Sequence, residues 1–478
     1  KIINSIASKL ASNFYTFDAC ILIIIFINNL RSIFMHAVIM AGGKGSRLAS
    51  ITRNEIPKPM VDIKSKPLLE WQLEELKKYG ITTVTMVVGY LSEKIIQYFG
   101  NGEDFGCEID YIIEEQALGT AGAFCFLTEK FINEKASDGY FMLVFGDVFF
   151  DIDIKKMENF HIEKKSKATL FVHPNSHPFD SDLVKVDEYS RVVEFDSKNN
   201  VRDYWYDNLV NAGLYILDKS ICTRVPLPVK TDFEKDILAV MAKNGEEIYA
   251  YKSPEFVKDI GTVERITSTV RDIESGFINS KNLSYKQKAI FLDRDGTINK
   301  FKGLIYDENE FELEAGAIEA IGLINKSGML AIVATNQPVV ARGLCDIKDV
   351  ENIHKKLSTL LGREGVFLDD ILFCPHHPDR GYPEENPRYK VECKCRKPDT
   401  GMAYEAAQRY HIDLKSSWMI GDTTIDMEFA RRLGMRSVLL KTGEGGLDCK
   451  FEVKPDIYAE NILDAVKKIF EREKINMQ

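Results

Sequence analysis

The sequence has no excess of basic residues, and this absence narrows the range of partners. Of its 478 residues, 62 are Lys or Arg and 72 are Asp or Glu, giving a formal net charge of -10. An acidic chain has no general affinity for nucleic-acid backbones or anionic membranes, although small phosphorylated substrates need only a few local cations. We therefore expect no nucleic-acid partner and no stable membrane association.

A long apolar segment is also lacking. The apolar stretch Cys20–Leu30 is too short to span a bilayer comfortably. It could be a signal-peptide core, but no small-residue cleavage site precedes the strand expected near His36. Because Met35 opens a natural first strand, we expect residues 1–34 to be a start-site artefact or a disordered extension. A membrane anchor is the alternative.

No internal repeat is visible, so the length predicts two different domains. The chain is 45% hydrophobic and 28% charged, as soluble globular proteins are. Strand and helix patterns alternate in two series, which predicts mostly parallel sheets covered on both faces. We expect an α/β fold with two doubly wound domains, an N-terminal half (35–273) and a C-terminal half (288–472), joined by a polar linker (274–287).

In the C-terminal half, two carboxylates follow an apolar strand. Asp293 and Asp295 stand in FLDRDGT, directly after Ala289–Leu292. One carboxylate can attack phosphorus while the other moves a proton to the leaving oxygen. Later strand ends meet at the same sheet edge. They add the hydroxyl of Thr335 and the amide of Asn336 for phosphoryl oxygens, the cation Lys397, and Asp422, which completes a magnesium site with Asp293 and Asp295.

This ordered set resembles the haloacid dehalogenase superfamily of phosphatases, from Lys288 to the C-terminus. The resemblance implies that Asp293 is the nucleophile and Asp295 the general acid/base. It implies that Thr335 and Lys397 stabilise the phosphoryl group. The alternative is that these acids only form turns and caps.

Cysteines are few and uneven, with one cluster near Lys397. Three of the nine cysteines and a histidine form a C-x-H…C-x-C set. Three thiolates and one imidazole suit a closed structural Zn²⁺ site, which would hold the catalytic lysine in place. We assign Cys374, His376, Cys393 and Cys395, with His377 as an alternative to His376. The alternative is that these three are ordinary reduced cysteines that bind no metal.

The zinc loop resembles the branch that contains heptose 1,7-bisphosphate phosphatases and histidinol-phosphate phosphatases. Residues 335–343, TNQPVVARG, resemble the TNQ…ARG loop of the heptose enzymes. This implies that Arg342 and Arg396 hold the phosphate that is not transferred, although Arg342 could be a solvated loop charge. A nucleic-acid 3′-phosphatase is disfavoured by the acidic balance and the lack of an aromatic-basic stripe.

The N-terminal half opens with a glycine-rich turn after a strand, MAGGKGSRL. Gly42, Gly43 and Gly45 let backbone N–H groups wrap triphosphate oxygens, and Arg47 adds a cation. Lys58 follows in IPKPM. The two motifs resemble the GGxGTRL…PKPM pattern of sugar-phosphate nucleotidyltransferases, over about residues 35–272.

That resemblance implies a second magnesium site and a set of substrate contacts. Asp147 and Asp259 would hold Mg²⁺ between the triphosphate and the sugar phosphate, where charge must be neutralised. Two positions depart from the pattern, Ala117 for Pro and Ser197 for Glu, which leaves the sugar identity open. The implied base- and sugar-contacting residues are Glu114, Gly119, Thr120, Lys198 and Asn211.

Together the halves predict a bifunctional cytoplasmic enzyme. A phosphatase that removes the 7-phosphate of a heptose 1,7-bisphosphate supplies the 1-phosphate that a nucleotidyltransferase needs. The transferase motifs look most like those of mannose-type guanylyltransferases, which favours GTP and a GDP-heptose for bacterial surface polysaccharides or glycoproteins. The alternatives are a histidinol-phosphate-type phosphatase fused to a transferase for another hexose 1-phosphate, or to a non-catalytic nucleotide-sugar sensor. The sugar anomer and the oligomeric state stay open, and an oligomer is compatible with the sequence.

Overall fold

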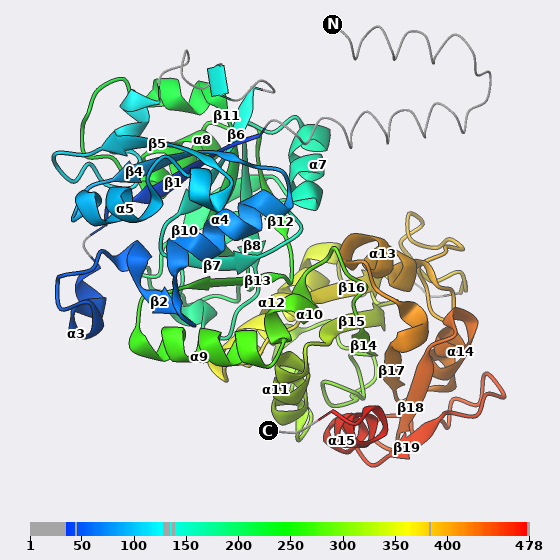
Figure 1. Ribbon diagram of the computed structural model, residues 1–478. Helices are drawn as coiled ribbons and strands as arrows, with labels where there is room; N and C mark the ends of the chain where they lie inside the picture. Colours follow the sequence, from blue (N-terminus) through cyan, green and yellow to red (C-terminus); the bar gives the residue numbers. More distant parts are fainter. Residues whose placement is uncertain (1–34, 44, 128–133, 136–138, 382–383, 476–478) are drawn as a thin grey trace, which may run out of the picture.

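The computed structural model describes residues 35–475, except residue 44 and residues 128–133, 136–138 and 382–383 (Figure 1). The expectations for residues 1–34, including the apolar stretch, lie outside this range. Within the described range, every helix is too short or too polar to cross a lipid bilayer.

The N-terminal half is built on a parallel sheet whose central strands are almost fully buried. Its middle runs in the order β6-β1-β4-β5, all parallel. Continuous apolar runs form these strands because helices cover both faces of the sheet. The strands are β1 (His36–Ala41), β4 (Thr83–Val88), β5 (Glu108–Ile113) and β6 (Tyr140–Phe145).

An antiparallel extension continues this sheet beyond β6. Strand β11 pairs antiparallel with β6, β8 and β9, while β12 joins β8 in parallel. The extension consists of β8 (Ala168–His173), β9 (Leu183–Val186), β10 (Val192–Asp196), β11 (Val210–Asp218) and β12 (Ile248–Lys252). Two short ribbons lie apart from it, β2 (Asp62–Ile63) with β3 (Lys66–Pro67) and β7 (Val148–Asp151) with β13 (Phe256–Asp259).

Helices cover this sheet with apolar stripes at helical spacing. In α4, Leu69, Leu73 and Leu76 recur every three or four residues and pack into the core with β1 and β4. The helices of this half are α3 (Ala49–Thr52), α4 (Leu68–Lys78), α5 (Ser92–Phe99), α7 (Ile154–Lys164), α8 (Ala239–Lys243) and α9 (Val263–Glu274).

The C-terminal half is a doubly wound domain with an all-parallel sheet in the order β16-β15-β14-β17-β18-β19. Alternate residues of β14 enter different cores: Ile290 and Leu292 one, Ala289 and Phe291 the other. Both faces of the sheet are therefore covered, and the predicted fold class is confirmed. The elements are β14 (Ala289–Leu292), α11 (Ala317–Ser327), β15 (Leu330–Asn336), α12 (Ile347–Arg363), β16 (Asp370–Cys374), α13 (Gly401–Tyr410), β17 (Trp418–Gly421), α14 (Thr424–Leu433), β18 (Arg436–Leu440), β19 (Ile457–Ala459) and α15 (Ile462–Glu473).

The stretch predicted as a linker is folded. Residues 274–287 contain helix α10 (Phe277–Lys281), and they bury Ile278 and Leu283 almost completely. The polar composition did not reveal this packing, because only a few apolar side chains anchor the segment. The exact domain boundaries remain a proposal.

Candidate active sites

The first candidate site lies where three neighbouring strands of the C-terminal half end. Strand β14 lies between β15 and β17, so the residues that follow them converge at one edge. Asp293 follows β14, and Asp422 follows β17. Carboxylate oxygens of Asp293, Asp422 and Asp426 all lie within 4.8 Å of one another, in a form that could hold a metal ion.

The electrostatics of this group favour a cation. Burial, together with the neighbouring carboxylates, raises the pKa of Asp293 to about 6 and that of Asp422 to about 8. Lys397 Nζ lies 2.8 Å from Asp293 and 2.6 Å from Asp426. Asp422 Oδ1 is buried and has no hydrogen-bond partner among the described residues. One lysine faces three acids, so the donor set fits an additional hard cation such as Mg²⁺.

The acidic group of the structure contains two of the three predicted magnesium ligands, Asp293 and Asp422. The Asp295 carboxylate lies outside this group among the described residues, and other side chains donate to it. Arg294 Nη2 donates to Asp295 Oδ2 at 2.9 Å, and Gln337 Nε2 donates to the same oxygen at 2.8 Å. Asp426, in the first turn of α14, is the third member of the group, and its oxygens accept from Lys397 Nζ at 2.6 Å and from Thr423 Oγ1 at 2.5 Å. The motif GDTTID carried this second aspartate, but its spacing alone did not assign it a role.

Two adjacent residues at the end of β15 support the lysine and the acid. Thr335 Oγ1 accepts a hydrogen bond from Gln337 Nε2 at 2.9 Å. The Asn336 side chain holds the main chain of Lys397 in two ways. Its Oδ1 accepts from Lys397 N at 2.9 Å and its Nδ2 donates to Lys397 O at 3.1 Å. Asn336 thus fixes the backbone that carries the lysine.

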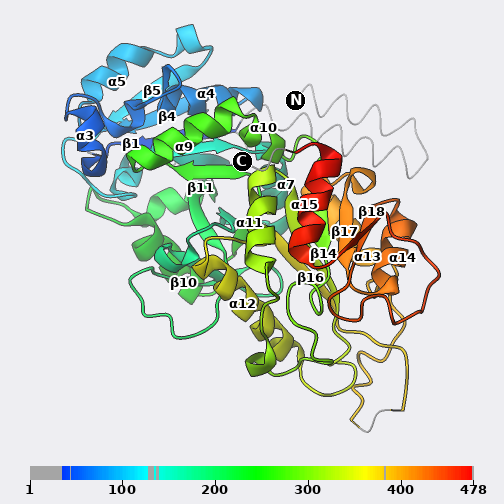
Figure 2. The same cartoon turned by 90° about the horizontal axis from the view of Figure 1, so that it is seen from below.

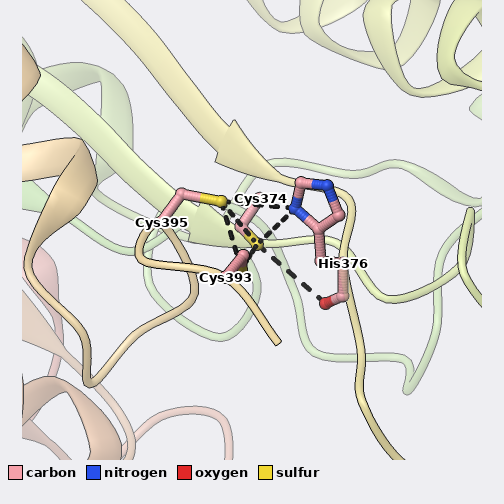
Figure 3. Close-up of side chains that lie close together, drawn as sticks. All are labelled: Cys374, His376, Cys393 and Cys395. Atoms are coloured by element: carbon pink, nitrogen blue, oxygen red, sulfur yellow. Dashed lines mark hydrogen bonds between the residues drawn. The ribbon is translucent and has the colours of Figure 1, made fainter. Parts of the chain in front are cut away.

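The four predicted zinc ligands come together in the loop after β16 (Figure 3). The three sulfur atoms are 3.2, 3.3 and 3.5 Å apart, and His376 Nδ1 lies 3.3 and 3.6 Å from two of them. A tetrahedral zinc ion with Zn–S distances of about 2.3 Å places sulfurs about 3.8 Å apart, whereas a disulfide needs about 2.05 Å. The group therefore fits a structural metal. His377 stands outside it.

Positive side chains line the neighbouring loop. Arg396 Nη1 donates to His376 O at 3.1 Å. Burial lowers the pKa of Arg396, and the charge of Arg342 acts in the same direction. A pocket of 480 Å³ is lined by Arg396, Lys397 and other residues of this loop. The arrangement can receive a second anionic group beside Lys397.

The second candidate site lies at the end of β1. Gly45 adopts φ +63°, and a Cβ atom there would lie 2.5 Å from Lys58 Cβ. The glycine-rich turn therefore packs directly on Lys58. Gly42 is equally close to Glu114, since a Cβ atom would lie 2.5 Å from Glu114 Oε2. Gly43 lies between Gly42 and Gly45 in this turn, and residue 44 is outside the described range.

Lys58 lies between the two predicted metal-binding aspartates. Its Nζ is 2.5 Å from Asp147 Oδ2 and 3.5 Å from Asp259 Oδ1. The β7–β13 ribbon joins these aspartates, because Ile260 N donates to Asp147 O at 2.7 Å. Both carboxylates therefore lie beside Lys58, close enough for one cation to bridge them.

Two arginines lie near Asp259. Arg265 Nη1 lies 2.5 Å from Asp259 Oδ2. Arg47 Nη2 lies 3.4 Å from the position of a Cβ atom on Gly261. Arg47 was predicted, whereas Arg265 was missed because it lies on α9, outside every motif that the sequence offers.

The predicted sugar-side residues fall into two groups. Gly119 and Thr120 pack on residues 229–233, and Thr120 Oγ1 accepts from Phe233 N at 2.7 Å. Asn211 Nδ2 donates to Glu234 Oε1 at 2.8 Å.

Glu234 is a site residue that the sequence did not reveal. Burial raises its pKa to about 7, and the charge of Lys198 acts in the opposite direction. Asn211 Nδ2 and the Tyr215 hydroxyl both donate to this carboxyl group, at 2.8 and 2.9 Å. Its motif, TDFEKD, carries no distinctive spacing.

Comparisons with known proteins agree with this division. Residues 36–276 match the family described as Nucleotidyl transferase, and residues 394–465 match the family described as HAD-hydrolase-like. The chain is 33% identical over 240 residues to D-glycero-alpha-D-manno-heptose 1-phosphate guanylyltransferase of Aneurinibacillus thermoaerophilus, which spans 50% of this chain and 99% of that protein.

The C-terminal half has its own relatives. The chain is 40% identical over 158 residues to D-glycero-beta-D-manno-heptose-1,7-bisphosphate 7-phosphatase of Photorhabdus laumondii, which spans 33% of this chain and 81% of that protein. A solved structure, D,D-heptose 1.7-bisphosphate phosphatase from B. bronchiseptica, aligns with a TM-score of 0.35 and 30% identity over 39% of this chain and 99% of that one. The chain therefore belongs to the nucleotidyl transferase family through its N-terminal half and to the HAD-like family of heptose-bisphosphate phosphatases through its C-terminal half.

Proposed function

We propose that the protein makes a nucleotide-activated heptose in two steps. The C-terminal half removes the 7-phosphate of D-glycero-D-manno-heptose 1,7-bisphosphate, and the N-terminal half transfers a guanylyl group from GTP to the remaining 1-phosphate. The observation that supports this proposal is the presence of two separate groups of carboxylates on one chain, each around a buried lysine. The relatives of the two halves act on heptose phosphates, as their names state.

In the phosphatase step, Asp293 attacks the phosphorus of the 7-phosphate and the bond from phosphorus to the C7 oxygen breaks. Asp295 gives a proton to the leaving oxygen and later takes one from the water that hydrolyses the aspartyl phosphate. Lys397 and Thr335 stabilise the phosphoryl oxygens, and Arg342 and Arg396 hold the 1-phosphate. Mg²⁺, held by Asp293, Asp422 and Asp426, would offset negative charge on the phosphoryl group.

In the transfer step, an oxygen of the sugar 1-phosphate attacks the α-phosphorus of GTP, and pyrophosphate leaves. The glycine-rich turn and Arg47 hold the triphosphate, while Lys58 lies where the two anions meet. Mg²⁺, held by Asp147 and Asp259, would reduce their repulsion. Glu114, Gly119 and Thr120 bind the base and sugar of the nucleotide, and Lys198 and Asn211 bind the heptose.

The chemistry fixes one anomer for both steps. Neither step breaks the bond between C1 and its oxygen, so the configuration at C1 passes unchanged from the bisphosphate to the nucleotide sugar. The named relatives carry the alpha prefix for the transferase and the beta prefix for the phosphatase. Because a joint product needs a common anomer, we assign the α anomer that the transferase relative uses.

The test supplies purified full-length protein with each anomer of the bisphosphate, each nucleoside triphosphate and Mg²⁺. The expected products from the α anomer and GTP are one phosphate, one pyrophosphate and GDP-heptose. Phosphate release without pyrophosphate would identify the N-terminal half as a sensor. Release from histidinol phosphate but not from either heptose would replace the phosphatase assignment. Since the nucleotide substrate is an intracellular metabolite, we place the reaction in the cytoplasm.

A further inference from the structure

Helix α12 of the C-terminal half lies beside the N-terminal half (Figure 2), where it contacts Pro178–Asp180. Lys356, Thr359 and Arg363 recur at helical spacing and therefore lie on one side of the helix. Thr359 Oγ1 accepts a hydrogen bond from Tyr206 N at 3.0 Å and lies 3.2 Å from Tyr206 O. This contact buries a backbone amide of the N-terminal half against a helix of the other half.

A tryptophan next to Tyr206 extends the contact. The Trp205 ring lies 5.4 Å from Lys356 Nζ and 5.5 Å from the Arg363 guanidinium. Trp205 Nε1 also donates to Glu308 Oε1 at 3.1 Å. Cations over an aromatic face and a satisfied indole N–H make this a specific docking contact.

Near the end of α12, the helix backbone also approaches a proline ring of the N-terminal half closely. A Cβ atom on Gly362 would lie 2.4 Å from Pro178 Cγ and 3.1 Å from Pro178 Cδ. The neighbouring atoms belong to a rigid ring, which cannot swing away as a long side chain could. Pro178 can therefore pack against the helix in this position only if residue 362 is glycine.

The docked stretches also carry a proposed sugar-binding residue. Arg202 Nη1 donates to Pro178 O at 2.7 Å, and its Nε donates to Asp196 Oδ2 at 2.8 Å. Lys198 N donates to Asp182 Oδ1 at 2.9 Å. Hydrogen bonds from Arg202 and Lys198 thus connect the segment that contains Pro178 to the segment that contains Tyr206. Lys198 lies within this connected region.

We propose that α12 of the phosphatase half is a positioning element of the sugar site in the transferase half, an inference that rests on the proposed function. Residues 197–209, between β10 and β11, form no helix or strand. Ser197 also stands where the family pattern has a glutamate. Docking on α12 restricts this loop before substrate binds, and such preorganisation strengthens binding by reducing the entropy lost on association.

The first test is Gly362→Ala in the full-length protein. Alanine favours the helix more than glycine does, so α12 itself is not weakened, while the new methyl group displaces Pro178. We expect the KM for α-heptose 1-phosphate to rise about tenfold, which corresponds to about 1.4 kcal/mol of lost sugar binding. The KM for GTP and the rate of phosphate release, which reports that α12 is folded, should stay within about twofold.

The second test is a double variant that should restore the sugar affinity lost in Gly362→Ala. Pro178→Ala removes the two ring atoms that the new methyl group would strike, so the double variant Gly362→Ala/Pro178→Ala should regain most of the sugar affinity. Thr359→Val removes the hydroxyl without changing the shape and should also raise the sugar KM. Thr359→Ser keeps the hydroxyl and should not.

An unchanged sugar KM in both Gly362→Ala and Thr359→Val would overturn the proposal. A loss in Gly362→Ala that Pro178→Ala does not reduce would do the same. If the unaltered protein forms no nucleotide sugar, the proposed function fails, and that result is seen before any variant is compared.

Discussion

At the residue scale, the activity of each candidate site depends on its own aspartates. Asp293→Asn keeps the size of the side chain but removes the nucleophile, so phosphate release should fall on the order of 10⁴-fold or more. Nucleotidyl transfer from supplied heptose 1-phosphate should be unchanged. Asp147→Ala is the mirror variant and should stop transfer while sparing phosphate release. The two rates are measured on the same samples, and loss of both activities in either variant would contradict independent chemistry.

Gly45 gives a second residue-scale prediction. In Gly45→Ala the backbone stays at φ +63° and the new methyl carbon meets Lys58 Cβ, whose ammonium group is fixed by two carboxylates. Displacing this lysine should reduce transfer about 10²-fold. In the matched variant Gly43→Ala, the methyl carbon meets no heavy atom of the described residues within 4 Å. Its loss should be smaller, and equal losses would refute the steric argument.

At the scale of elements, the zinc loop makes the phosphatase depend on a metal. Lys397 lies two residues after Cys395, so loss of one ligand should free the lysine together with the loop. Cys393→Ser should lower zinc from about one ion per chain and reduce phosphate release about 10–100-fold, without affecting transfer. Elemental analysis and the two assays check this.

The control for the loop is an exposed cysteine of the same half. Cys449→Ser removes a thiol that lies outside the four-ligand group. Zinc content and both activities should match those of the unaltered protein. A zinc loss in this control would show that the metal is held elsewhere.

The sequence predicted those site residues that follow a strand directly. Asp293, Asp422 and Asp147 each come after a continuous apolar run, and the parallel order of strands places such residues at one edge. Residues placed by helix starts or by distant contacts were missed. Asp426 joins the acidic group from the first turn of α14, and the hydrogen bond from Gln337 to Asp295 connects residues 42 positions apart. Local patterns do not contain these contacts.

At the scale of the whole molecule, the sequence predicted two domains but not the structure that joins them. The stretch 274–287 lacks periodicity, and its few buried residues gave no signal. Asn282 bonds to Asp151, and Lys252 Nζ donates to Asp370 Oδ1 at 2.6 Å across the halves. Interfaces within one chain consist of such scattered polar and apolar contacts, so composition does not distinguish them from an exposed linker.

Glu255 makes this junction sensitive to pH. Its Oε1 accepts hydrogen bonds from Asp153 N at 2.6 Å and Leu283 N at 2.8 Å, and its Oε2 accepts from Ser253 Oγ at 2.8 Å. Burial raises the pKa of Glu255 from 4.5 to about 7. The folded chain therefore holds a proton that the unfolded chain has already lost between these values, so this residue lowers stability as pH rises through that window.

Replacing the carboxyl group by an amide removes this titration. In Glu255→Gln the amide oxygen can accept both backbone bonds and the amide nitrogen can donate to Ser253. The unfolding free energy of the variant minus that of the unaltered protein should increase by about 2–3 kcal/mol from pH 5 to pH 8. Denaturant titration followed by circular dichroism at both pH values measures the gain, with Glu264→Gln, a change on the surface of α9, as the control. Glu255 joins the start of α7 to the segment after α10. If the difference in unfolding free energy between variant and unaltered protein does not change with pH, this junction is hydrated enough to keep Glu255 ionised, which would contradict the prediction.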